Sequence, residues 1–163
     1  MCVALVVLFL VRYFSGELPP TPPEPLAAGV HRLVRVVDGD TLIFEPHATV
    51  RLIGVDTPET VKPEHAVEAY GPEATAFTRE FLSGGEARLA FDRERVDRFG
   101  RFLAYVWVDD RMLNEELLRA GLARWEAHFS YSQTNKDRFR RAQQEARQEH
   151  LGIWSQRVLE PVR

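Results

Sequence analysis

Turn-forming residues recur so closely between residues 31 and 55 that this stretch can form only short strands. Three runs rich in β-branched and apolar residues are separated by turn-forming residues, and Pro58 stops the last run. Gly39 gives the first turn its backbone freedom, and Pro46 lies in the second turn. The runs cover 31–37, 41–44 and 49–55, with turns at 38–40 and 45–47. Consecutive short strands with tight turns predict a meander.

The rest of the domain alternates between helix and strand patterns. Proline and glutamate in the first turn favour a helix beginning at 71–73, and the residues Ser83, Gly84 and Gly85 end it. Thr134 is the expected cap of a long last helix that reaches about residue 150. The other expected elements are a loop at 61–69, strands at 87–91 and 102–108, a charged connection at 92–101, and a helix at 112–122.

Five strands and three helices, with one helix between the third and fourth strands, follow the order of an OB-fold barrel. Periodicity alone indicates only a mixed α/β protein with a small barrel or sheet.

Length and composition indicate one soluble domain with a short appendage. The 163 residues are 45% hydrophobic and 28% charged, with a formal net charge of −3. This balance does not favour a protein that holds nucleic acid by net charge alone, although arginines gather at 88–101 and 138–147. Cys2 is the single cysteine, so no intrachain disulfide can form.

The N-terminus predicts export or membrane attachment. Residues 2–11 are apolar, which is shorter than a membrane-spanning helix and similar to a signal-peptide core, but no basic residue precedes them. A signal or anchor with a misplaced start, a short membrane anchor, and a buried apolar element all remain open. The expected division is an apolar segment at 1–16, a proline-rich linker at 17–29, the domain at 30–154 and a tail at 155–163. The expected location is therefore secreted or associated with the cell envelope.

Two carboxylates form a candidate metal site. Asp40 and Asp56 lie near the ends of the first and third expected strands, which can be neighbours in a meander. Oxygen ligands suit a hard cation such as Ca²⁺, and the carbonyl of Thr57 could add a third. The alternative is that Asp38 and Asp40 shape a turn and Asp56 caps one. Asp38 is expected to be structural in either case.

Two arginines form a candidate phosphate clamp. The guanidinium groups of Arg51 and Arg101 match pairs of phosphate oxygens and stay charged. The alternatives are a strand arginine with a solvated head for Arg51 and a surface partner of Asp97 for Arg101. Glu59, just after the metal turn, could accept a proton from a water molecule, or could be an ordinary loop glutamate. Together these groups suggest metal-assisted chemistry on a phosphodiester.

Three segments carry a resemblance to a known family: 38–41 (DGDT), 51–60 (RLIGVDTPET) and 97–101 (DRFGR). In this order and spacing they resemble the thermonuclease, or staphylococcal-nuclease-like, family, and the likeness runs from about 30 to 154. The resemblance implies a five-stranded OB-fold barrel flanked by three helices. It implies a Ca²⁺-dependent nuclease that cuts DNA and RNA with little sequence preference and leaves 3′-phosphate ends. It assigns Ca²⁺ to Asp40, Asp56 and Thr57, the phosphate to Arg51 and Arg101, and the water to Glu59.

The chain also departs from that family. Thermonucleases carry tyrosine where this chain has Phe99, and further tyrosines near Ala127 and Phe129. Phe99 can still stack on a base, and Arg98 could supply charge to a neighbouring phosphate. Trp125, Phe129 and Tyr131 are candidates to replace the lost stacking surface, with a core role as the alternative for Trp125. Single-stranded substrate should be favoured, and nothing demands more than a monomer.

Two other functional classes compete with the nuclease. One is a non-catalytic nucleic-acid-binding OB-fold module, which the presence of Asp40, Arg51, Glu59 and Arg101 argues against. The other is a membrane-tethered structural domain, supported by the N-terminus alone.

Overall fold

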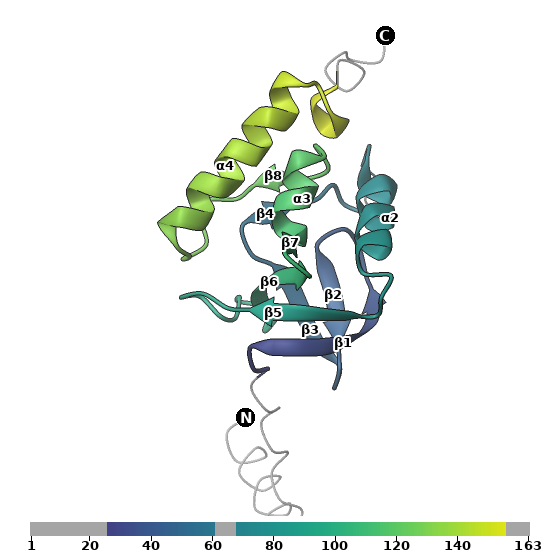
Figure 1. Ribbon diagram of the computed structural model, residues 1–163, viewed down its shortest axis with the longest axis vertical. Helices are drawn as coiled ribbons and strands as arrows, with labels where there is room; N and C mark the ends of the chain where they lie inside the picture. The colour runs from purple at the N-terminus through teal and green to yellow at the C-terminus, as the bar shows by residue number, and fades with distance from the viewer. Residues whose placement is uncertain (1–25, 61–67, 156–163) are drawn as a thin grey trace, which may run out of the picture.

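The computed structural model describes residues 26–60 and 68–155 (Figure 1). The predictions for segments 1–16 and 17–25, for the tail after 155, and for most of the 61–69 loop lie outside this range. Within the two described stretches, no helix is both long enough and apolar enough to cross a bilayer.

A closed barrel of five strands forms the centre of the molecule. The strands are β1 (Gly29–Val36), β2 (Thr41–Phe44), β3 (Ala48–Leu52), β5 (Glu86–Ala90) and β6 (Phe102–Val108). Neighbours pair antiparallel in the order β3-β2-β1-β5-β6, and a parallel pairing of β3 with β6 closes the ring. The predicted five-stranded barrel with three helices is confirmed. Because the barrel is closed, each of these five strands pairs with a neighbour on both sides.

Strand alternation fills the barrel interior. Leu42 and Phe44 of β2, Val50 and Leu52 of β3, and Leu89 of β5 are all almost fully buried. Residues next to them, such as Ile43 of β2 and Arg88 of β5, are more exposed, because successive side chains of a strand point to opposite faces. The interior is therefore a packed apolar core rather than a channel.

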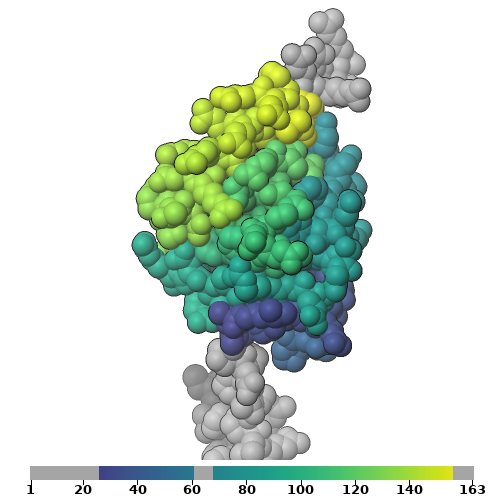
Figure 2. All heavy atoms as spheres, in the orientation of Figure 1, coloured from purple at the N-terminus to yellow at the C-terminus, as the bar shows by residue number. Residues whose placement is uncertain are grey.

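Three helices cover one end of this barrel. They are α2 (Gly71–Phe81), α3 (Leu113–Arg119) and α4 (Gln133–Gln148), followed by the short η1 (Gly152–Trp154). In Figure 1, α3 lies between α2 and α4 above the strands. The space-filling view shows α4 and η1 as a ridge at the end opposite β1 (Figure 2). This arrangement leaves the β1–β2 turn beside α2.

The third strand is shorter than the sequence predicts. It ends at Leu52, the chain turns at Gly54, and β4 (Val55–Asp56) pairs instead with β8 (Arg124–Trp125). Gly54 has a φ of 78°, and a side chain there would meet the Tyr131 ring at 2.8 Å. Apolar residues continue through the turn as Leu52, Ile53 and Val55, so the hydrophobic pattern could not reveal this break.

Two other boundaries also differ from prediction. The Ser132 side chain accepts a hydrogen bond from the Asn135 amide and caps α4, so the cap predicted at Thr134 is wrong by two residues. The helix predicted at 112–122 is α3, which begins at Leu113 and already ends at Arg119, and β7 (Arg111–Met112) precedes it as a short strand against β6. Both shifts fall within the uncertainty of boundaries inferred from sequence.

Candidate active site

The β1–β2 turn is held by Asp38. One of its carboxylate oxygens, Oδ1, accepts hydrogen bonds from the amides of Asp40 at 3.1 Å and Thr41 at 2.7 Å. The Thr78 hydroxyl of α2 donates to the Gly39 carbonyl at 2.7 Å. The structural role predicted for Asp38 is therefore confirmed, and α2 fixes where the turn lies.

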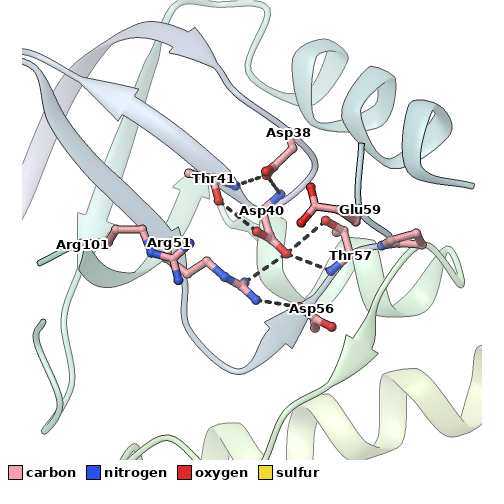
Figure 3. A pocket seen from close by; sticks show the side chains of 9 residues that line it. Asp38, Asp40, Thr41, Arg51, Asp56, Thr57, Glu59 and Arg101 are labelled. Carbon is pink, nitrogen blue, oxygen red and sulfur yellow. Dashed lines mark hydrogen bonds and ion pairs between the residues drawn. The ribbon is translucent and has the colours of Figure 1, made fainter. Parts of the chain in front are cut away.

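Asp40 is buried and joins two of the sequence segments (Figure 3). Its Oδ2 accepts hydrogen bonds from the Thr57 amide at 2.8 Å and the Thr57 hydroxyl at 3.0 Å. The Thr41 hydroxyl donates to Oδ1 at 3.1 Å. Thr57 thus holds the carboxylate in place, a role that the sequence did not suggest. Its carbonyl as a metal ligand stays a prediction.

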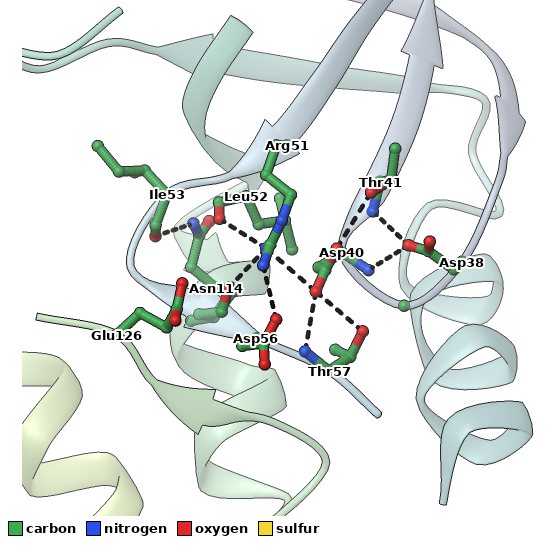
Figure 4. Close-up of polar contacts among 12 residues, drawn as sticks. Asp38, Asp40, Thr41, Arg51, Leu52, Ile53, Asp56, Thr57, Asn114 and Glu126 are labelled. Carbon is green, nitrogen blue, oxygen red and sulfur yellow. Dashed lines mark hydrogen bonds and ion pairs between the residues drawn. The ribbon is translucent and has the colours of Figure 1, made fainter. Parts of the chain in front are cut away.

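Arg51 links both candidate metal-binding carboxylates (Figure 4). Its Nη1 lies 3.0 Å from Asp40 Oδ2, and its Nη2 donates to Asp56 Oδ1 at 2.8 Å. Nη1 also donates to the carbonyls of Leu52 at 3.2 Å and Val55 at 2.5 Å. The side chain is only 8% exposed, so the alternative of a solvated strand arginine is wrong. Arg51 fixes the β3–β4 turn as well as facing the pocket.

Asn114 is a positioning residue that sequence reasoning missed. This fully buried side chain on α3 donates to the carbonyls of Ile53 at 3.0 Å and Ala104 at 3.2 Å, and it accepts from the Val106 amide at 3.0 Å. It therefore ties the β3–β4 turn to β6. No local motif marks it, because its partners are 8, 10 and 61 residues away.

Arg101 is oriented by Asp97. Its Nε donates to Asp97 Oδ2 at 2.7 Å, and Asp97 Oδ1 accepts from the amides of Arg101 and Phe99. The ion pair proposed as the alternative role therefore exists, and it orients Arg101 into the pocket. Burial would raise the pKa of Asp97, but these hydrogen bonds outweigh it and lower the pKa. Asp97 therefore stays ionised beside the guanidinium.

The predicted residues converge on one pocket of about 210 Å³. Asp40, Arg51, Asp56, Glu59 and Arg101 all line it. The remaining lining residues are Asp38, Thr41, Thr57 and Pro58. Carboxylates and guanidinium groups thus line one small cavity, as Figure 3 shows.

The pocket concentrates negative charge. Burial, together with the neighbouring Asp40 charge, raises the pKa of Asp38 to about 6. Burial also raises the pKa of Asp56, and the attraction of Arg51 does not fully offset it. A divalent cation would relieve this repulsion, and carboxylate oxygens are the ligands that Ca²⁺ prefers. The donor set therefore fits a hard cation.

Protein ligands alone would not complete a cation's coordination shell. Within 26–60 and 68–155, no three His, Cys, Asp or Glu side chains are grouped to hold a metal ion. Asp40 and Asp56 would need the Thr57 carbonyl, water or a phosphate oxygen to complete the six to eight ligands of Ca²⁺. Such a site stays open to substrate.

Glu59 lines the pocket and follows the turn that carries Asp56 and Thr57. Its Oε1 accepts from the Thr60 amide at 3.0 Å, and its backbone exchanges hydrogen bonds with Glu68 across the 61–67 segment. The carboxylate is thereby held over the same cavity as Asp40. This position is compatible with a water-activating role.

A second cavity, which we call the side groove, adjoins the pocket. It measures about 380 Å³ and shares Arg51 and Arg101 with it. Asp97, Arg98 and Phe99 line it from the connection between β5 and β6, and Glu126, His128 and Phe129 line it from the segment before α4, with Glu94 also in the lining. Sequence reasoning missed Glu94, Glu126 and His128, because no motif joins these distant segments.

Phe99 is the exposed aromatic surface of the side groove. It is 67% exposed, and the guanidinium carbons of Arg98 and Arg101 lie 4.7 and 5.5 Å from its ring centre. Phe129 and Tyr131 are both buried, so the suggestion that they supply free stacking surface is wrong. Trp125 is half-buried against the core and donates its Nε1 proton to the Tyr131 hydroxyl, which favours its packing role.

These features define a class of protein. It is an OB-fold barrel that presents two carboxylates and two arginines in one pocket, which suits a divalent cation and a phosphate. The model of the staphylococcal nuclease homologue family matches residues 49–156.

Similar proteins agree with that match. The chain is 44% identical over 160 residues to the thermonuclease of Staphylococcus intermedius, covering 94% of this chain and 93% of the relative. It is 42% identical over 161 residues to the thermonuclease of Staphylococcus hyicus, with the same coverage. Endonuclease YncB of Bacillus subtilis is 43% identical over 129 residues, covering 76% of this chain and 60% of that protein. The chain therefore belongs to the staphylococcal nuclease family, and it is a thermonuclease homologue.

Proposed function

We propose that this protein is a Ca²⁺-dependent nuclease that hydrolyses phosphodiester bonds of DNA and RNA with little sequence preference. The observation that carries the proposal is the single pocket in which Asp40 and Asp56 face Arg51 and Arg101. Family membership supports the nuclease class, and the oxygen donor set supports the cation.

Each side chain has a distinct part in the proposed reaction. Asp40, Asp56 and the Thr57 carbonyl would hold Ca²⁺, whose Lewis acidity would stabilise charge on a bound phosphate oxygen. Arg51 and Arg101 would bind the equatorial oxygens, where negative charge grows during attack. Glu59 would orient a water and accept its proton. Water would then bond to phosphorus as the bond to the 5′-oxygen breaks; the 5′-oxygen would take a proton from solvent and leave as a hydroxyl group, and the 3′-phosphate would remain.

The side groove supports a preference for single strands. Its exposed Phe99 ring offers a stacking surface for a base, and Arg98 offers charge to an adjoining phosphate. Stacking is tolerant of sequence because every base has a π face. A base inside an intact duplex cannot reach such a surface without unpairing, so frayed or single-stranded substrate should be cut faster.

The test uses the full chain with single-stranded DNA and with RNA. Ca²⁺, Mg²⁺ and then a chelator are added in separate reactions, and the product ends are analysed. We expect Ca²⁺-dependent cleavage that leaves 3′-phosphates. Binding without cleavage in any metal would overturn the hydrolytic proposal in favour of a recognition module, and 5′-phosphate ends would overturn the direction of bond breaking.

A variant pair tests the clamp. Losing one donor to the transition-state charge costs about 10²–10³ in rate, so Arg101→Ala should lose that much activity. Arg140→Ala removes an equal charge from an exposed position on α4 and should keep full activity. Equal activity of the two variants would contradict the role of Arg101.

A further inference from the structure

The two walls of the side groove come from distant parts of the chain. One wall is the 92–101 connection between β5 and β6, which carries Phe99 and Arg101. The other is the 126–129 segment before α4, which carries His128 and Phe129. The width of the groove depends on what holds these segments together.

Glu94 joins the two walls by a reciprocal pair of hydrogen bonds. Its amide donates to the Ser130 carbonyl at 3.0 Å, and its carboxylate Oε2 accepts from the Ser130 amide at 2.7 Å. Ser130 directly follows Phe129, so this pair, together with the Ser132 amide that donates to Asp92 Oδ2 at 2.9 Å, sets where that wall lies. Glu94 is itself a groove-lining residue, whereas it does not line the pocket of Asp40 and Arg51.

The phosphate-facing arginines do not depend on Glu94. Arg51 is held by Asp40, Asp56 and two carbonyls, and Arg101 is held by Asp97. A change at Glu94 should therefore alter the groove while leaving the pocket in place. This separates base binding from the hydrolytic step.

We propose that Glu94 is a positioning residue that fixes the width of the side groove and so determines affinity for the nucleobase beside the cleaved phosphate. The inference rests on the nuclease function proposed above. Packing contacts weaken steeply with distance, since a gap of about 0.5–1 Å forfeits a quarter to a half of the attraction. Without the Glu94 carboxylate, the Ser130 amide would lose its acceptor, and the 126–129 wall would shift away from a base stacked on Phe99.

Two substitutions at Glu94 separate the effect of side-chain length from the effect of charge. Glu94→Gln keeps the acceptor that the Ser130 amide needs but removes the charge, whereas Glu94→Asp keeps the charge on a side chain too short to reach. With single-stranded DNA, Glu94→Ala and Glu94→Asp should raise KM about fivefold or more, with little change in kcat, because base stacking contributes about that much or more to affinity. Glu94→Gln should behave like the wild type. Glu86→Ala, an exposed acidic residue on β5, is the matched control.

A second substrate shows whether the effect acts through the base. An oligonucleotide that lacks the base beside the cleaved bond should bind the wild type more weakly and should lose nothing further in Glu94→Ala. The inference would be overturned if Glu94→Ala lost equal affinity for both substrates. It would also be overturned if Glu94→Asp had the KM of the wild type, or if Glu94→Gln had the raised KM of Glu94→Ala.

The binding of each oligonucleotide, measured by fluorescence anisotropy, separates this inference from the proposed function. If the wild type binds the intact oligonucleotide more tightly but cuts neither, the proposed hydrolysis is wrong and the inference on Glu94 stands. A wild type that binds both equally overturns the role of Glu94, whatever its activity.

Discussion

Arg51 combines a structural role with the phosphate-binding role proposed for it. It is buried, pairs with Asp40 and Asp56, and donates to the carbonyls of Leu52 and Val55. Arg101, by contrast, is 29% exposed and pairs with Asp97 alone among the described acidic residues. Replacing arginine should therefore lower the free energy of unfolding more at position 51 than at position 101.

Replacing each arginine by lysine should separate these roles. An ammonium group cannot provide the two-pronged contact, so both variants should lose about 10²–10³ in rate. Each buried acceptor left without a donor costs about 1–3 kcal/mol, so Arg51→Lys should lower the free energy of unfolding by at least that amount. Arg101→Lys should lower it by no more than about 1 kcal/mol. Urea unfolding and initial rates measure both quantities, and equal stability losses would contradict the distinction.

Gly39 is required by a close approach rather than by an unusual φ. A Cβ atom there would lie 2.7 Å from the Thr57 hydroxyl and 2.9 Å from the Ala74 side chain. Gly39→Ala should therefore displace Thr57 from Asp40 and cost about 1–3 kcal/mol of stability, as overpacking does. It should also weaken Ca²⁺ binding measured by calorimetry. Gly84→Ala, where a Cβ meets nothing within 4 Å, is the control, and equal effects would refute the argument.

At the scale of elements, α4 begins where Ser132 caps it. Ser132→Ala should lower the free energy of unfolding by about 1 kcal/mol, because the Asn135 amide loses its acceptor. Thr134→Ala lies inside the first turn and should change stability by less than about 0.5 kcal/mol. Thermal unfolding of the two variants measures the difference, and a larger loss in Thr134→Ala would restore the cap first predicted there.

The elements also show what sequence could and could not predict. Local signals, such as the residues around Pro72 that open α2 and the turn at Gly39, identified the barrel strands and the helices, although the ends of β3 and α3 and the cap of α4 differ from prediction. The break at Gly54 and the role of Asn114 depend on contacts with residues far along the chain, so no local pattern could reveal them. The motif residues of the pocket were found because they lie in three short segments that resemble a known family, whereas Glu94 and Glu126 lie outside those segments and were missed.

At the scale of the whole molecule, the connection between β5 and β6 is fastened to the start of α4. Asp92 Oδ2 accepts from the Tyr105 hydroxyl at 2.8 Å and from the Ser132 amide at 2.9 Å. Burial would raise the pKa of Asp92, but these hydrogen bonds outweigh it and lower the pKa from 3.8. The ionised carboxylate thus links the barrel to the helix that lies across its end.

This link makes stability dependent on pH in a definite direction. Because the folded pKa of Asp92 lies below the unfolded value of 3.8, its contribution is complete above pH 3.8 and is lost as pH falls through the folded pKa. An amide at this position keeps an acceptor but loses the charge, so Asp92→Asn should be less stable at pH 7 by about 1 kcal/mol, the difference between hydrogen bonds to a charged and to a neutral acceptor. The difference from wild type should shrink steadily below pH 3.8. Asp110→Asn, an exposed position, should show no difference at any pH. Urea unfolding from pH 7 to pH 3 measures this, and a constant difference would mean that Asp92 acts through shape and not through charge.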